Sequence, residues 1–269
     1  MLNPFIVFGG GSYDSSTIAL INKAESLGYT KPSNLNPLDN LIKGLKNINV
    51  WAKLDLFYLL AHDMPTSEAN FRRLNIINPD AYQLTFEGGW TFGKSGAIGN
   101  GTNTRIRTGF TPLVSSGNYS VNSATRFATI YENTNTPENI NQTGIDSVSG
   151  QTSFQLIAST NTGSRTHSVN SAGGASVDLS GNGFKAIVRR TDTETFTKSK
   201  AQVFTPIGTN SVDTTTYPSE ILVGQRGANY TNMIFSQYAI GSALTNTELD
   251  GIRGLINAYY LELSLSQIA

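Results

Sequence analysis

The two histidines of this sequence, His62 and His167, are its candidates for a general base near neutral pH. Nucleophilic catalysis by a hydroxyl group needs such a base beside the nucleophile. His62 precedes Asp63, but side chains at neighbouring positions diverge, so this adjacency does not build a triad. No Gly-x-Ser-x-Gly turn accompanies either histidine. We expect His62 at a helix end or on the surface and His167 in a polar strand, neither of them catalytic.

Asp192 and Glu194 have the spacing that places two carboxylates on one face of a strand. Glycoside hydrolysis uses such a pair, held about 5 or about 6.5–9.5 Å apart. The two residues lie in a Thr-rich stretch that is typical of a hairpin tip, where solvated charges are common. Glu132, Glu138 and Asp146 lie around a long polar stretch without a partner at a useful spacing. We therefore expect that the protein is not an enzyme.

Ligands for metals and cofactors are sparse. Calcium binds roughly six to eight oxygens, several of them usually carboxylates. Asp178 and Asp213 each begin a polar turn that could supply one or two, so they are weak candidates for a structural calcium. The glycines before Ser12 lack the Gly-Lys-Ser or Gly-Lys-Thr of a phosphate-binding loop. No cofactor is expected.

Aromatic side chains near predicted turns could form a platform for sugar rings. The candidates for glycan contact are Trp90, Tyr119, Tyr217 and Tyr230. Tyr and Trp serve both as surface stacking groups and as core residues with a polar edge. Trp90, in Gly-Trp-Thr-Phe, fits either position, so stacking and burial both stay open.

Residues 14–64 have the pattern of three short helices. The first two begin at a capping residue or a proline, and their apolar residues recur at helical spacing. The predicted helices run from Asp14, Ser15 or Ser16 to Gly28, from Asn36-Pro37 to Ile48, and from Trp51 to Leu60. Helices this short must pack on a larger body.

Residues 65–269 have the pattern of a β-domain closed by a helix, since short apolar or alternating runs recur between Gly- and Asn-rich turns. The predicted strands are Tyr82–Phe86, Ala97–Ile98, Thr104–Thr108, Thr125–Tyr131, Ser153–Ser159, Arg165–Val169, Phe184–Arg190, Ser199–Phe204, Glu220–Gly224 and Met233–Ile240. Asn133–Gly150 is predicted to be a loop, and Thr245 and Glu248 have the spacing of a capping box. The predicted fold class is mostly β: an antiparallel jelly-roll sandwich with an N-terminal helical segment and a C-terminal helix.

Composition excludes several classes of protein. The 269 residues carry 19 basic and 19 acidic side chains, so there is no basic excess for nucleic acid. The absence of Cys excludes a disulfide framework. No window reaches the roughly 18 apolar residues of a membrane span, and the first residues lack the basic segment of a secretion signal. We expect no nucleic-acid or membrane partner and no signal peptide.

Three stretches resemble parts of tailed-phage virion proteins. In Ala19–Ala61, Gly28 and Trp51 match the helical lead-in of those proteins, and Phe235–Leu263 is similar to their last strand and closing helix. Gly96–Phe110 looks like the early strand pair of their concanavalin-like (laminin-G-like) jelly roll. The resemblance implies a component of the virion surface: a head or tail fibre, an appendage or a decoration protein.

The first 13 residues are predicted to form a docking arm. Its apolar residues are Phe5, Ile6, Val7 and Phe8, and its hinge is Gly9, Gly10 and Gly11. Glycine populates positive φ freely, so the arm can leave the body at any angle. The apolar residues could add an edge strand to the chain's own sheet, or dock on a neighbouring protein by β-augmentation. We favour docking, because the same segment left exposed would promote aggregation.

The leading functional hypothesis is a non-enzymatic structural component of a tailed-phage virion, acting in assembly and in adhesion to the host surface. Its expected partners are other virion proteins and further copies of itself, with a trimer as the guess. One alternative is a carbohydrate-binding module that recognises host-surface glycan, and another is a glycan depolymerase.

Overall fold

The computed structural model describes residues 12–65, 69–111, 117–131, 183–192, 220–226 and 229–265, together with the strands at 141–144, 156–158, 165–167, 175–177, 195–198 and 204–206. Several residues singled out above therefore lie outside the described residues: Phe5, Ile6, Val7, Phe8, Gly9, Gly10, Gly11, Glu132, Glu138, Asp146, Asp178, Glu194, Asp213 and Tyr217. The side chain of His167, in a described strand, is also outside the description.

The described fold is mostly β, as predicted, and all strand pairings given for it are antiparallel. The larger sheet contains, in spatial order, β13 (Phe204–Pro206), β12 (Thr195–Lys198), β11 (Gly183–Arg189), β6 (Ala124–Tyr131), β17 (Ile234–Gly241), β4 (Gly96–Ile98) and β3 (Thr91–Gly93), with β1 (Leu54–Leu59) also paired to β17. The smaller sheet contains β2 (Thr85–Glu87), β5 (Arg105–Arg107), β14 (Leu222–Val223), β7 (Asn141–Gly144) and β8 (Leu156–Ala158). Two further pairs join β9 (Arg165–His167) to β10 (Ala175–Val177), and β15 (Gln225–Arg226) to β16 (Asn229–Tyr230).

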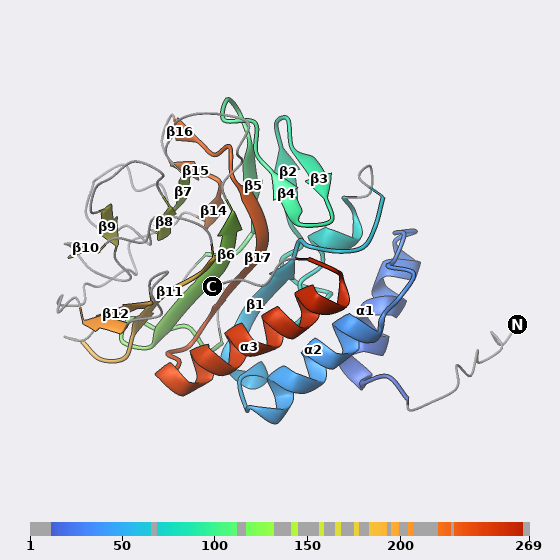
Figure 1. The fold of residues 1–269 in the computed structure, drawn as a ribbon, viewed down its shortest axis with the longest axis horizontal. Helices are drawn as coiled ribbons and strands as arrows, with labels where there is room; N and C mark the ends of the chain where they lie inside the picture. The colour runs from blue at the N-terminus through green and yellow to red at the C-terminus, as the bar shows by residue number, and fades with distance from the viewer. Residues whose placement is uncertain are drawn as a thin grey trace, which may run out of the picture.

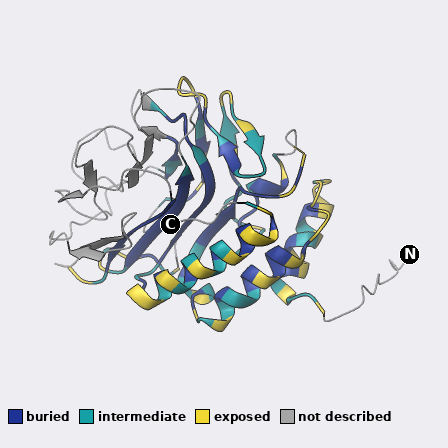
Figure 2. Cartoon of the chain, in the orientation of Figure 1, coloured by how far each residue is buried: buried dark blue, intermediate teal, exposed yellow. Residues whose placement is uncertain are grey.

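The larger sheet lies between the helices and the smaller sheet (Figure 1). Along β6, Phe127 packs toward the helices, whereas Ala128 and Ile130 pack toward the smaller sheet. Because successive side chains of a strand point to opposite faces, a strand covered on both sides is apolar on both sides. The central strands are accordingly buried along their length (Figure 2).

Three helices cover one face of the larger sheet: α1 (Ser15–Ser26), α2 (Asn36–Asn47) and α3 (Asn246–Glu262), with short turns η1 (Trp51–Lys53) and η2 (Phe71–Arg73). Asp14 caps α1 by accepting a hydrogen bond from Ser16 N at 2.8 Å. The capping box of Thr245 and Glu248 is confirmed at the start of α3. Gly28 follows α1 with φ of +68°, as predicted for a helix stop.

The helices and the larger sheet share one hydrophobic cluster. Leu20 of α1, Leu41 of α2, Phe57 of β1 and Ile256 of α3 all belong to it. In Figure 1, α2 and α3 lie side by side across the sheet. The predicted helical segment is thus packed on the β-body. None of the helices in the described part of the chain has the length and apolar character needed to cross a bilayer.

The predicted helix from Trp51 to Leu60 is wrong. The chain makes only the turn η1 there and then enters β1, which pairs with β17. A short apolar run fits a buried helix and a buried strand equally well, so periodicity does not decide between them. Pairing with Gln237–Gly241 of β17 decides it, because it supplies backbone partners along the run.

Most strand predictions are confirmed in position. The three long central strands, β6, β11 and β17, overlap the predicted Thr125–Tyr131, Phe184–Arg190 and Met233–Ile240. Besides β1, six of the described strands were not predicted: β3, β10, β12, β15, β16, and β7, which lies within the predicted loop Asn133–Gly150. Most of them are short and polar or contain glycine, so they give little strand signal, and pairing with a neighbouring strand determines them.

Candidate functional site

His62 is buried, not a helix-end or surface residue as predicted. Its side chain is 2% exposed and packs edge-on against Phe71 and Tyr259. The hydroxyl of Tyr259 donates to Ala61 O at 2.8 Å and lies 3.0 Å from His62 Nδ1. Burial, with a smaller contribution from the Arg72 guanidinium, lowers the pKa of His62 to about 3. The imidazole is therefore neutral and enclosed.

The acidic residues near the candidate catalytic positions do not assemble a site. Asp63 is exposed and faces Lys94, whose Nζ lies 3.4 Å from its carboxylate. Asp192 is exposed, and its backbone carbonyl accepts from Arg189 at 3.2 Å. In the part of the chain that the structure describes, no three acidic or histidine side chains gather as metal ligands.

Tyr119 is in the core. Its side chain is 4% exposed, and its ring packs edge-on against Phe110. Asp55 fixes the backbone here by accepting from the amides of Gly117, Asn118 and Tyr119 at 2.9–3.1 Å. The ring of Tyr119 is therefore not available for stacking on a sugar, because it is buried in the hydrophobic cluster between the two sheets.

Trp90 is only partly buried and lies where the two sheets are connected. It follows β2, an edge strand of the smaller sheet, and precedes β3, an edge strand of the larger one (Figure 1). The indole N–H donates to Arg105 O at 3.0 Å. The ring packs edge-on against Phe86 and Phe235, at centroid distances of 6.2 and 6.3 Å. These contacts fix the orientation of the indole.

Two turns beside Trp90 are joined by asparagine side chains. Asn100 Oδ1 accepts from the amides of Thr102 and Asn103 at 2.9 and 3.1 Å. Asn103 Oδ1 in turn accepts from Asn100 Nδ2 at 2.8 Å and from Gly89 N at 3.2 Å. Gly89 directly precedes Trp90. The turn between β4 and β5 is therefore bonded to the turn that presents the indole.

Glycines allow this close approach. A Cβ on Gly88, whose φ is +83°, would lie 2.2 Å from Asn103 O. Gly224, with φ of +84°, lies between β14 and β15 and packs beside the indole, because a Cβ there would lie 3.0 Å from Trp90. In each case a larger residue would force the segments apart.

We call this region the Trp90 end; it comprises Gly88, Gly89, Trp90, Asn100, Thr102, Asn103 and Tyr230. Asn103 is exposed. Among the residues that the structure describes, none accepts a hydrogen bond from Asn103 Nδ2, so its two N–H donors are available. Tyr230 is partly exposed and pairs in register with Gln225, the neighbour of Gly224. Of the predicted glycan residues, Trp90 lies at this end, Tyr230 lies on a strand that pairs beside Gly224, the glycine next to the indole, and Tyr119 lies in the core.

From sequence alone, Gly99, Asn100 and Gly101 carry only the signal of a turn. Asn100 and Asn103 were not predicted as site residues, because their role depends on Gly89, more than ten residues earlier in the chain. The density of Gly and Asn was the available signal. It did not show which turn would meet which aromatic side chain.

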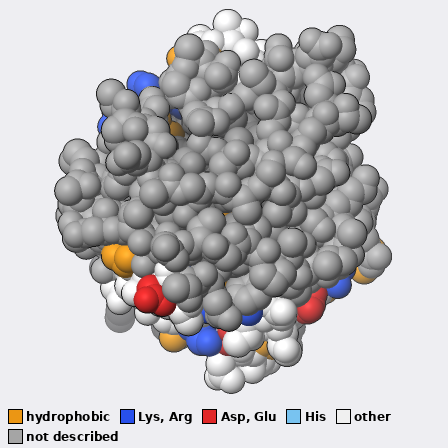
Figure 3. All heavy atoms as spheres, turned by 90° about the vertical axis from the view of Figure 1, so that its left-hand side faces the viewer, with side chains coloured by type: hydrophobic (Ala, Val, Ile, Leu, Met, Phe, Trp, Pro, Cys, Tyr) orange, Lys and Arg blue, Asp and Glu red, His pale blue; other side chains and the backbone are white. Residues whose placement is uncertain are grey.

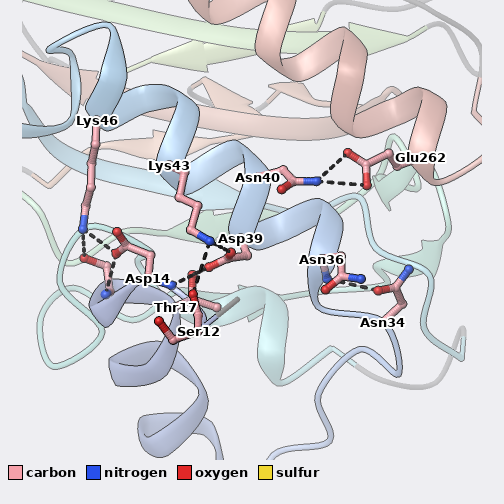
Figure 4. Close-up of polar contacts among 11 residues, drawn as sticks. Ser12, Asp14, Thr17, Asn34, Asn36, Asp39, Asn40, Lys43, Lys46 and Glu262 are labelled. Carbon is pink, nitrogen blue, oxygen red and sulfur yellow. Dashed lines mark hydrogen bonds and ion pairs between the residues drawn. The ribbon is translucent and has the colours of Figure 1, made fainter. Parts of the chain in front are cut away.

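A second polar group, around Asp39, fixes the end of the predicted arm and the residues that follow it (Figure 4). Asp39 of α2 is 4% exposed, and its Oδ1 accepts from Asp14 N at 2.8 Å and from Thr17 Oγ1 at 2.7 Å. Lys43 Nζ lies 2.7 Å from Asp39 Oδ2 and 3.4 Å from Ser12 O. Burial raises the pKa of Asp39, but the bonds from Lys43, Thr17 and Asp14 outweigh it, and the pKa is lowered overall.

Figure 3 shows no patch of one charge sign among the side chains that are described on that face. Basic and acidic groups are interspersed along its lower rim. Around the Trp90 end, Glu87 pairs with Arg105, and Arg107 pairs with Glu220 and Glu87. Both observations agree with the overall charge balance of the sequence.

Comparison with known proteins shows likeness of fold alone. No protein-family model matches the chain, and no curated protein matches it. Among solved structures, a Trypanosoma rangeli sialidase in complex with 2-keto-3-deoxy-D-glycero-D-galacto-2,3-difluoro-nononic acid is similar, with 11% identity and a TM-score of 0.51. The match covers 85% of this chain and 40% of the sialidase, so the chain spans about two fifths of that protein's length.

Two other solved structures are more distant. One is domain 4 of AbnA, an extracellular arabinanase from Geobacillus stearothermophilus, in complex with arabinotriose; it is 15% identical over 74% of this chain and 98% of that domain, with a TM-score of 0.45. The other is the binding domain of botulinum neurotoxin DC in complex with rat synaptotagmin II, 13% identical over 76% of this chain and 52% of that chain, with a TM-score of 0.48. At these TM-scores neither likeness bears on function.

Proposed function

We propose that this chain is a non-catalytic glycan-binding module, built on a jelly-roll sandwich, whose site is the Trp90 end. The observation that carries the proposal is the pairing of a partly exposed indole with the free amide donors of Asn103, held together through Gly89. Sugar rings present an apolar face of C–H groups and an edge of hydroxyls. An aromatic face and a carboxamide are complementary to these two surfaces.

The preorganisation of the site favours binding. The indole is fixed by Arg105 O and its aromatic neighbours, and the Asn103 carboxamide is fixed by Asn100 and Gly89. A ligand therefore does not have to order these side chains, which would otherwise cost about 0.5–1.5 kcal/mol each. Tyr230, on β16, is the predicted second aromatic contact.

The test is a glycan array with the purified full chain, followed by calorimetric titration of the glycans that bind. Trp90→Phe keeps an aromatic ring at this position but loses stacking area and the bond to Arg105 O, and Asn103→Ala removes the amide donors. Both should weaken binding about tenfold, since each removes on the order of 1.4 kcal/mol of interaction.

The matched controls are Trp51→Phe and Asn78→Ala. Trp51 is the other tryptophan of the chain and packs beside Lys46. Asn78 is an exposed turn residue whose Oδ1 accepts from Asp80 N at 3.1 Å. Neither control should alter binding. An array that stays blank, or equal losses in variants and controls, would contradict the proposal.

A second candidate function is supported by the network around Asp39. We propose that the chain is also a structural component of a tailed-phage virion, held in a homo-oligomer or to other virion proteins by residues 1–13. Because Asp39 and Lys43 fix Ser12 and Asp14, the preceding residues start from a defined point beside α1 and α2. A defined starting point is what a docking arm requires.

The arm is tested by deleting residues 1–11 and by replacing Phe5, Ile6, Val7 and Phe8 with Ser. Both variants should keep the unfolding midpoint of the full chain, since the contacts of Asp39 are retained. Both should fail to incorporate into particles, and both should elute as monomers in size-exclusion chromatography with light scattering. Normal incorporation of both variants would rule out the arm as the anchor.

A further inference from the structure

We infer that the Trp90 end selects uncharged glycans over acidic ones. This inference rests on the proposed function and adds to it the chemical class of the ligand. The aromatic and polar side chains of the Trp90 end are an indole, carboxamides and hydroxyls, all of them neutral. Recognition of an acidic sugar normally uses a free guanidinium or ammonium group, because a carboxylate or sulfate is best matched by charge-assisted hydrogen bonds.

The two arginines of the adjacent strand β5 are already paired with carboxylates, and the guanidinium of Arg73 lies over the Phe86 ring, 5.7 Å from its centroid. Arg105 Nε donates to Glu87, and Arg107 Nε donates to Glu220. The pKa of Arg107 is raised, chiefly by its hydrogen bond to Glu220, which means that the charged pair is favoured. An acidic glycan that approached these arginines would meet the negative charge of Glu87 and Glu220.

The hydrogen-bonding groups also suit hydroxyls. Asn103 offers two N–H donors, and Thr102 Oγ1, which donates weakly to Asn100 O at 3.4 Å, retains acceptor capacity. A sugar hydroxyl both donates and accepts, so one hydroxyl can satisfy Asn103 while its neighbour donates to Thr102. A ring with an unsubstituted apolar face can then lie over Trp90.

One further charged residue belongs to the strand pair β15 and β16. Arg226 belongs to β15, whose partner strand β16 carries Tyr230, and it pairs in register with Asn229. Because its side chain is not described, Arg226 is tested directly. If selection for neutral glycans is set by the groups around Trp90, removing this charge should leave binding to neutral glycans unchanged.

The experiment titrates the full chain with two matched sets of oligosaccharides, one of neutral hexoses and pentoses and one carrying uronic acid, sialic acid or sulfate. We expect the neutral set to bind at least about tenfold more tightly. We also expect less than about a twofold change in affinity between 0.01 M and 1 M salt, over which screening shortens from about 30 to about 3 Å.

Two substitutions sharpen the test. Asn103→Asp keeps the acceptor for Gly89 N but exchanges the free donors for an anionic oxygen, so it should weaken neutral binding about tenfold. Arg226→Ala should change it less than about twofold. The inference would be overturned if the acidic set bound more tightly and in a salt-sensitive way. It would also be overturned if Arg226→Ala lost binding. Either result would leave glycan binding itself intact. Failure of both sets to bind would instead overturn the proposed function.

Discussion

The side chain of Asn75 takes the place of a neighbouring strand beside Phe57. Asn75 Oδ1 accepts from Phe57 N at 3.0 Å, and Asn75 Nδ2 donates to Asp55 O at 3.1 Å. The next residue continues the pattern, because Ile76 N donates to Phe57 O at 2.9 Å. The outer edge of β1 is thereby closed, which protects it from pairing with another chain.

Replacing Asn75 with Ala should destabilise the fold by about 1–3 kcal/mol, because it leaves the buried amide of Phe57 without its acceptor. Chemical denaturation followed by tryptophan fluorescence measures the change. The exposed residue Asn78 provides the control, since Asn78→Ala should cost less than about 0.5 kcal/mol. Equal losses in the two variants would show that Asn75 does not close the edge.

Stability should fall in mild acid because of His62. Burial lowers its pKa from 6.5 to about 3, so below pH 6.5 the unfolded chain binds a proton that the folded chain does not. The free energy of unfolding should therefore decrease by about 1.4 kcal/mol per pH unit below pH 6.5 and level off below about pH 3. The difference in unfolding free energy between the wild type and His62→Asn isolates this effect. A difference that is constant with pH would contradict it.

Two glycines should respond to alanine with opposite signs. A Cβ on Gly241 of β17 would lie 2.2 Å from Lys53 O, against backbone that cannot move without separating β1 from β17. Gly241→Ala should destabilise by about 1–3 kcal/mol or more. Gly254, inside α3, has open space at the same position, so Gly254→Ala should stabilise by about 0.5–1 kcal/mol through helix propensity. Thermal unfolding of the two variants tests both signs.

Replacing Asp39 with Asn should loosen the start of α1. The ion pair with Lys43 is lost, and one buried acceptor becomes a donor that faces Lys43. We expect a loss of about 1–3 kcal/mol at neutral pH, and protection of the α1 amides from hydrogen exchange should fall with it. The pKa of Asp39 is lowered in the folded state, so its contribution is present above its unfolded pKa and disappears as pH falls through the folded one.

The exposed pair of Lys23 and Asp80 provides the control for Asp39. Its atoms are 2.7 Å apart, but the Asp80 side chain is 78% exposed. Asp80→Asn should therefore change stability by less than about 1 kcal/mol, as solvent screens such pairs. A loss as large as that of Asp39→Asn would indicate that burial is not what makes Asp39 important.

Local signals in the sequence determined the features that need only neighbouring residues. Asp14 and the pair Thr245 and Glu248 cap helices within one turn of the chain, and Gly28 ends α1 by its own backbone preference. The long strands β6, β11 and β17 were predictable because apolar residues dominate them. The mostly β fold class followed from the same local signals.

Tertiary structure alone decided the rest. β1 is a strand because β17, almost 180 residues later, supplies its hydrogen-bond partners, and His62 is buried because Tyr259 closes over it. The Trp90 end exists because Asn103 reaches Gly89 across two turns. Periodicity and capping depend on residues within a few positions of each other, whereas these contacts depend on which distant segments the fold brings together.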